Sequence, residues 1–106
     1  MATTVTAPAF LFPQDYDPQS EFETPSRGYL GDVTVQFSEG TCYRLYFIDA
    51  ARLQQNLNDE VALGRPYFAE PNMVVLPEVT TQAVRDAVRK LWIGGFFERL
   101  LPCNGR

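Results

Sequence analysis

The alternation of apolar and polar residues between Asp32 and Phe47 constrains the fold more than any other feature of the sequence. Apolar side chains occupy every second position on both sides of a short polar turn. These positions are Val33, Val35, Phe37, Tyr43, Leu45 and Phe47. A period of two on each side of a turn is typical of a β-hairpin that buries one of its faces.

The register of the hairpin depends on the length of its loop. A two-residue turn would set Val35 opposite Arg44 and would mix the apolar set with a charge. A three-residue loop over 38–40 instead pairs Val35 with Tyr43, and it places Gly40 where a left-handed backbone is required. The sequence therefore predicts the three-residue loop.

Two helices are expected after the hairpin. Asp49 can cap a helix over 50–63, which Gly64 would end, and Thr80 can cap a second helix that stops at Gly94. In both segments the apolar residues recur at helical spacing, which indicates one buried face each. We expect the first helix to be a surface helix packed on the sheet.

The uniformly apolar run Met73–Leu76 lies between the two helices and predicts a strand covered on both faces. The resulting order is a β-hairpin followed by α-β-α (ββαβα). We therefore predict an α+β fold, a small two-layer sandwich, with room for an extra N-terminal edge strand over 10–12 and a short apolar closing segment over 96–101. Residues 29–106 would form this single α+β domain, because a chain of 106 residues can bury only a modest core.

The net charge of −4 is concentrated near the N-terminus, where residues 1–40 carry six acids against Arg27 alone. Three prolines and four acids fall within residues 13–28, and we expect residues 1–28 to form an extended acidic N-terminal arm. Its carboxylates could steer the chain toward a basic protein and its aromatics could anchor it there. The candidate partner-binding residues of the arm are Asp15, Tyr16, Asp17, Glu21, Phe22 and Glu23. The alternative is a solvated loop whose Tyr16 and Phe22 pack against the sheet.

The hairpin face opposite the apolar set carries Thr34, Gln36, Cys42, Arg44 and Tyr46. Arginine and tyrosine are common anchors of protein interfaces, so Arg44 and Tyr46 join the candidate partner-binding residues. Coverage of this face by the arm is an alternative, and a homodimer formed across it is another.

The loop over 65–72 supplies an alternative ligand site, with Arg65, Tyr67 and Glu70 as its candidate residues. The competing interpretation is a structural connector in which Arg65 pairs with Glu70 or Glu60, and Phe68 fills the core.

Catalysis finds no support in the sequence, because the chain has no histidine. Without histidine there is no Ser-His-Asp or Cys-His pair and no metal triad of the usual kind. The only cysteines, Cys42 and Cys103, lie far apart, which excludes a structural zinc site and leaves a disulfide open. We expect no enzyme activity, no cofactor and no metal.

Nucleic acid and membrane are also disfavoured as partners. The isoelectric point of about 4.6 opposes phosphate binding, and no apolar run approaches the length of a spanning helix. The apolar part of the N-terminus follows no basic residue and is too short for a secretory signal. We therefore expect a cytoplasmic protein in a reducing environment.

The function predicted from these features is that of a small, acidic, non-enzymatic interaction protein of the inhibitor or immunity type. It would bind a basic protein partner and occlude it through the arm and the outer face of the hairpin. The alternative is a small ligand-binding or catalytic homodimer that uses the 65–72 loop.

Overall fold

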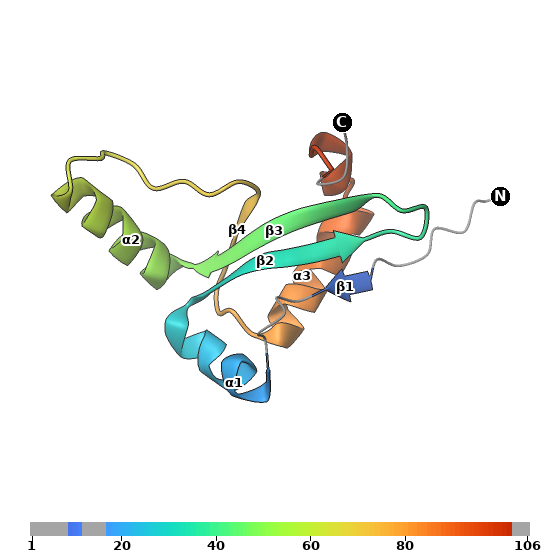
Figure 1. The fold of residues 1–106 in the computed structure, drawn as a ribbon, viewed down its shortest axis with the longest axis horizontal. Helices are drawn as coiled ribbons and strands as arrows, with labels where there is room; N and C mark the ends of the chain where they lie inside the picture. Colours follow the sequence, from blue (N-terminus) through green and yellow to red (C-terminus); the bar gives the residue numbers. More distant parts are fainter. Residues whose placement is uncertain (1–8, 12–16, 103–106) are drawn as a thin grey trace.

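The computed structural model describes residues 9–11 and 17–102, and it confirms the α+β class (Figure 1). The elements, in chain order, are β1 (Ala9–Leu11), α1 (Pro18–Arg27), β2 (Tyr29–Gln36), β3 (Cys42–Asp49), α2 (Ala50–Ala62), β4 (Met73–Leu76), α3 (Thr81–Ile93) and the short 3-10 helix η1 (Phe96–Arg99).

The strands form one sheet in the order β1-β2-β3-β4, with β4 parallel to β3 and the other neighbours antiparallel. Val35 pairs with Tyr43, so the predicted register of the hairpin is confirmed. The Phe37 N–H donates to the Thr41 carbonyl oxygen at 2.8 Å and closes the three-residue loop, in which Gly40 has a φ of 102°.

A β-bulge interrupts β2 where it passes Tyr46. Leu30 pairs with Phe47 and Val33 pairs with Leu45, so two residues of β2 oppose one residue of β3. The bulge keeps Leu30 and Val33 on the same buried face although they are three residues apart. Asp32, which has a φ of 57°, lies at the bulge and is exposed.

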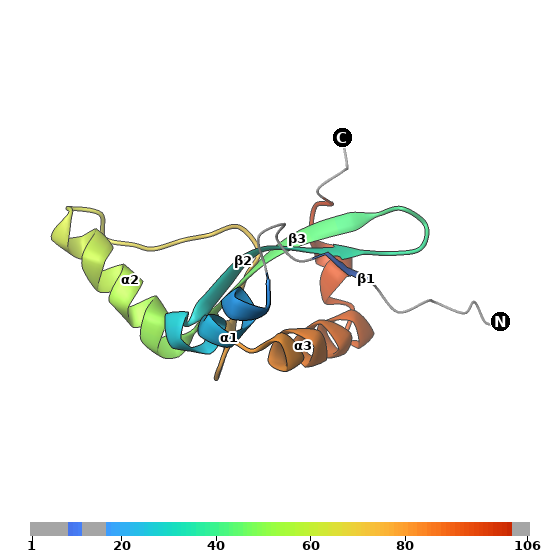
Figure 2. The ribbon, with the colours of Figure 1, turned by 60° about the horizontal axis from the view of Figure 1, so that its bottom comes forward.

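The core lies on one face of the sheet, between the hairpin and α3. Figures 1 and 2 show α3 on that face and η1 at its C-terminal end. The buried cluster comprises Leu30, Val33, Val35, Phe37, Leu45, Phe47, Leu76, Val79, Val84, Val88 and Phe97. Burial of each such side chain contributes about 2 kcal/mol, and the alternation in the hairpin places its apolar side chains in this cluster.

Both predicted helix starts are confirmed by their caps. The Asp49 carboxylate accepts from the Arg52 N–H at 2.7 Å, and the Thr80 hydroxyl accepts from the Ala83 N–H at 2.9 Å. Val84 and Val88 of α3 are fully buried, as the spacing predicted.

The prediction that the helix over 50–63 packs on the sheet is wrong. None of the residues of α2 is buried, and the helix projects beyond the end of the sheet (Figures 1 and 2). Its apolar stripe is thin, because Leu53, Leu57 and the 56% exposed Val61 lie one full turn apart among polar neighbours. Such a stripe can anchor the first turn without holding the helix against the sheet.

The expectation that Met73–Leu76 is covered on both faces is also wrong. β4 pairs only with β3 at an edge of the sheet, and Val75 is 49% exposed. The reason is the position of α2, which leaves the outer face of β4 open.

Within the predicted extended arm, residues 18–27 instead form α1. The Asp17 carboxylate accepts from the Ser20 N–H at 2.8 Å, Pro18 occupies the first helical position, and Gly28 ends the helix with a φ of 80°. Each of these is a standard helix signal, but the proline content, with Pro25 inside the helix, favoured an extended chain. Asp15 and Tyr16 lie outside the described residues, as does Phe12 of the predicted edge strand.

Cys42 is disulfide-bonded at the start of β3, whereas Cys103 lies outside the described residues. The cytoplasmic location expected from the sequence stays a prediction. Over the residues that the structure describes, no helix is both long and apolar enough to cross a membrane.

Candidate functional site

The face of the sheet opposite the core is the main candidate site. Thr34, Gln36, Arg44 and Tyr46 lie on it, and among the described helices none covers it in Figure 1 or Figure 2. Gln36 and Arg44 are exposed, and Tyr46 is half-buried. We call this surface the open face.

A short stack of aromatic and cationic groups closes one end of the open face. The rings of Tyr29 and Tyr46 stack with centroids 6.1 Å apart, and the Arg52 guanidinium lies 5.1 Å from the centroid of Tyr29. The Tyr46 ring lies against the backbone of Gly31, where an added Cβ would come within 3.2 Å of it. Ile48, two residues beyond Tyr46, is fully buried, so this end of the face is packed.

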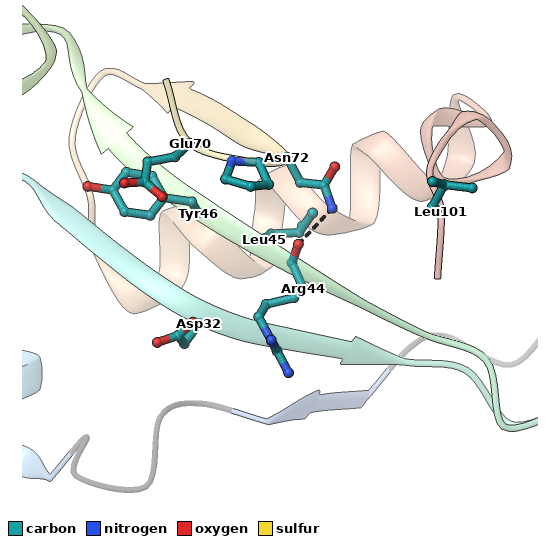
Figure 3. Close-up of a pocket in the computed structure, with 8 residues that line it drawn as sticks. Asp32, Arg44, Leu45, Tyr46, Glu70, Asn72 and Leu101 are labelled. Atoms are coloured by element: carbon teal, nitrogen blue, oxygen red, sulfur yellow. Dashed lines mark hydrogen bonds between the residues drawn. The ribbon is translucent and has the colours of Figure 1, made fainter. Parts of the chain in front are cut away.

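Beside this stack the open face is hollowed, with a cavity volume of about 350 Å³ (Figure 3). The lining residues are Asp32, Arg44, Leu45, Tyr46, Glu70, Pro71, Asn72 and Leu101. The hollow lies across β3, with Asp32 of β2 on one side and Glu70 on the other. In Figure 3, Glu70 lies beside the Tyr46 ring and the Arg44 guanidinium points away from both.

Asn72 fixes the end of the 65–72 loop against β3. Its side-chain amide donates to the Arg44 carbonyl oxygen at 2.9 Å, and its own carbonyl oxygen accepts from the Tyr46 N–H at 3.2 Å. Asn72 has a φ of 54°, a left-handed conformation that asparagine tolerates better than most residues. These bonds hold Glu70 over the open face.

Burial raises the pKa of the Tyr46 phenol above its ordinary value, and the nearby Glu70 carboxylate raises this pKa further. Arg52 opposes the shift. The phenol is therefore neutral near pH 7 and can donate a hydrogen bond to a bound group.

The candidate residues of α1 divide into two kinds. Asp17 caps the helix, and the Ser20 backbone N–H lowers the pKa of this carboxyl. Glu23 accepts from Arg27 at 2.9 Å and from the Gln19 side chain at 3.1 Å. Glu21 is exposed and Phe22 is 83% exposed, so the alternative in which Phe22 packs against the sheet is wrong.

The structure does not bring the three candidate residues of the alternative ligand loop together. Arg65 forms an ion pair with Glu60, as the connector interpretation predicted, and Tyr67 is 61% exposed. Only Glu70 of the three candidates lines the hollow. Phe68 is half-buried and takes no part in the core cluster, so its predicted core role is wrong.

Sequence reasoning missed Tyr29, Asp32, Arg52 and Asn72. Asp32 lines the hollow only because of the bulge, and no local sequence pattern predicted this bulge. Arg52 reaches Tyr29 because α2 starts directly after β3, and the position of the Asp49 cap could have indicated this proximity. The Pro71-Asn72 pair is typical of a turn. It predicts a loop, but it does not predict that Asn72 contacts β3.

No three histidine, cysteine, aspartate or glutamate side chains within residues 9–11 and 17–102 lie close enough together to hold a metal ion. Comparison of the chain with protein-family models, with curated proteins and with solved structures finds no match. The functional argument therefore rests on the geometry of the chain itself.

Proposed function

We propose that this chain is a non-enzymatic interaction protein of the inhibitor type, which binds a basic protein partner and occludes it. The observation that carries the proposal is the open face, a sheet surface with tyrosine, arginine and carboxylate groups and no helix over it among the described elements. Interfaces are enriched in tyrosine and arginine, and such groups on a rigid sheet lose little conformational entropy on binding.

The acidic helix α1 supports the choice of a basic partner. Its C-terminal end is joined to Tyr29 through Gly28, so this end of α1 lies next to the stack that closes the open face. Phe22 offers an apolar anchor, and Glu21 forms no ion pair with another described residue. A carboxylate beside an exposed ring combines electrostatic steering with a desolvated contact.

Partner capture at two salt concentrations tests this proposal. The baits are the full chain and its variants Glu21→Gln and Phe22→Ala, both at exposed positions that leave the core intact. We expect one basic protein to bind the parent chain at low salt, to bind less at high salt, and to be depleted with either variant.

Asp59→Asn is the matched control for this experiment. Asp59 is exposed on α2, which projects away from α1, and both this substitution and Glu21→Gln remove one negative charge. Equal capture by all three variants and the parent chain would refute a role for α1, and capture of nothing at either salt would refute the interaction itself.

A ligand-binding homodimer is the second candidate, and the hollow with Asp32, Arg44 and Glu70 on its walls is the observation in its favour. Variants in α1 should leave ligand binding at this hollow intact. Sedimentation analysis that finds only a monomer would count against this candidate.

A further inference from the structure

A second hollow lies on the core side of the sheet, at the opposite end of the hairpin from α2. It has a volume of about 260 Å³ and is lined by Phe37, Glu39, Tyr43, Trp92, Gly95, Phe97 and Glu98. These residues come from the hairpin loop and its flanking strands, the end of α3 and η1, which lie together in Figure 1. None of them belongs to the open face or to α1.

Four aromatic rings form the walls of this hollow. Phe37 lies 5.8 Å from Tyr43, 5.5 Å from Phe97 and 6.5 Å from Trp92, measured between ring centroids. Tyr43 and Phe97 are 5.1 Å apart. The interplanar angles run from 50° to 87°, so the rings meet at an angle and do not form a flat stack.

The charges around the hollow are all of one sign. Glu39 and Glu98 contribute carboxylates, and no lysine or arginine among the described residues lines the hollow. Glu98 lies over Gly95, with a carboxylate oxygen 3.8 Å from the position that a Cβ on Gly95 would take. Neither glutamate forms an ion pair with another described residue.

We propose that this hollow binds a small quaternary ammonium compound. The negative faces of aromatic rings attract cations, and two carboxylates add to that attraction. A quaternary ammonium group has no N–H and gives up no hydrogen bond to water when it enters an aromatic site, whereas a primary ammonium gives up such bonds, which the two exposed carboxylates replace only in part. A volume of about 260 Å³ suits a group of this size better than a larger ligand.

Trp92 is the only tryptophan of the chain and reports on the site directly. The experiment is a titration of the full chain with choline chloride, followed by tryptophan fluorescence, with sodium chloride at equal ionic strength as the reference. We expect a saturable change with choline. The neutral isostere 3,3-dimethyl-1-butanol and the primary amine ethanolamine should each bind at least about tenfold more weakly.

Two variants test the carboxylates. Replacing both acids, Glu39→Gln with Glu98→Gln, should weaken choline binding by about tenfold, while Glu78→Gln, an exposed acid at the other end of α3, should leave it unchanged. Circular dichroism of each variant verifies that it is folded. The two glutamates are exposed, so their replacement does not disturb the aromatic core.

Three results would overturn the proposal: no saturable change with choline beyond that with sodium chloride, equal binding of the neutral isostere, or unchanged binding by the double variant. The same chemical group also occurs at the surface of phosphatidylcholine vesicles. Binding to free choline without association with such vesicles assigns the site to a soluble ligand, and association with both assigns it to the headgroup as well. Failure of this titration leaves the partner proposal untouched, because the two surfaces share no residue.

Discussion

Tyr46 shows most clearly how a single residue acquires its properties from the fold. The alternation of apolar and polar residues alone predicted that Tyr46 lies on the outer face of the hairpin. Its contact with Gly31, its stacking on Tyr29 and its proximity to Glu70 depend on the bulge and on a loop more than twenty residues away. No local pattern encodes these contacts, so the electrostatics of the candidate site were beyond prediction.

The raised pKa of Tyr46 is a testable consequence of those contacts. Because burial is its main cause and Glu70 the second, Glu70→Gln should lower this pKa while leaving it above the ordinary value. Carbon NMR of the tyrosine rings, with the Tyr46 signal assigned through Tyr46→Phe, measures it. Glu98→Gln, a change of equal charge at a residue that does not line the hollow of the open face, is the control and should have no effect.

The same shift links Tyr46 to stability at alkaline pH. The folded state binds the phenol proton more tightly than the unfolded chain, whose tyrosine pKa is about 10. This stabilisation is therefore complete below about pH 10 and is lost as the pH rises through the folded-state pKa. A Tyr46 that titrates at the ordinary value would contradict the burial and the proximity to Glu70 described above.

At the scale of elements, the sequence correctly predicted the features that depend on residues close together in the chain. The Asp49 and Thr80 caps, the glycine at the hairpin loop and the stripe of α3 each lie within a few residues of the structure they specify. The failures concern partners far away in the chain. The periodicity of α2 is real, but whether its stripe meets the sheet depends on the direction in which the chain leaves β3, and α1 was missed because its proline content outweighed its caps.

Gly28 joins α1 to β2 and packs against the start of α2, which gives a prediction at this scale. Its φ of 80° disfavours any side chain, and an added Cβ would lie 2.8 Å from both Arg52 Cβ and an Asp49 carboxylate oxygen. We expect Gly28→Ala to lower the free energy of unfolding by about 3 kcal/mol, the sum of backbone strain and overpacking. Urea denaturation provides the measurement.

Gly64→Ala separates the two contributions to that loss. Gly64 has a φ of 90° and nothing within 4 Å of an added Cβ, so only the backbone strain of about 1 kcal/mol applies. Equal losses for the two variants would mean that Gly28 is not in close contact with Asp49 and Arg52.

The molecule as a whole is a sheet with one buried and one open face, so the core that stabilises it and the proposed partner surface lie on different sides. Val84 and Val88 of α3 are fully buried against the hairpin, whereas α2 leaves the other side uncovered. A helix on each side would have given more buried area but no exposed sheet for a partner. The alternation in the hairpin predicted a sheet with one buried face, and only the uniformly apolar β4 indicated burial on both faces.

Paired valine substitutions test this division. Val88 is fully buried and Val75 is 49% exposed on the uncovered side of β4. Val88→Ala should lower the free energy of unfolding by about 2 kcal/mol, because it removes buried methyl groups and leaves a cavity. Val75→Ala should cost less than about 1 kcal/mol, mainly through β propensity. Both values come from urea denaturation of the full chain. Comparable losses would mean that the face around β4 is covered in solution, by a second copy or by another part of the chain, and the open face would then no longer be available to a partner.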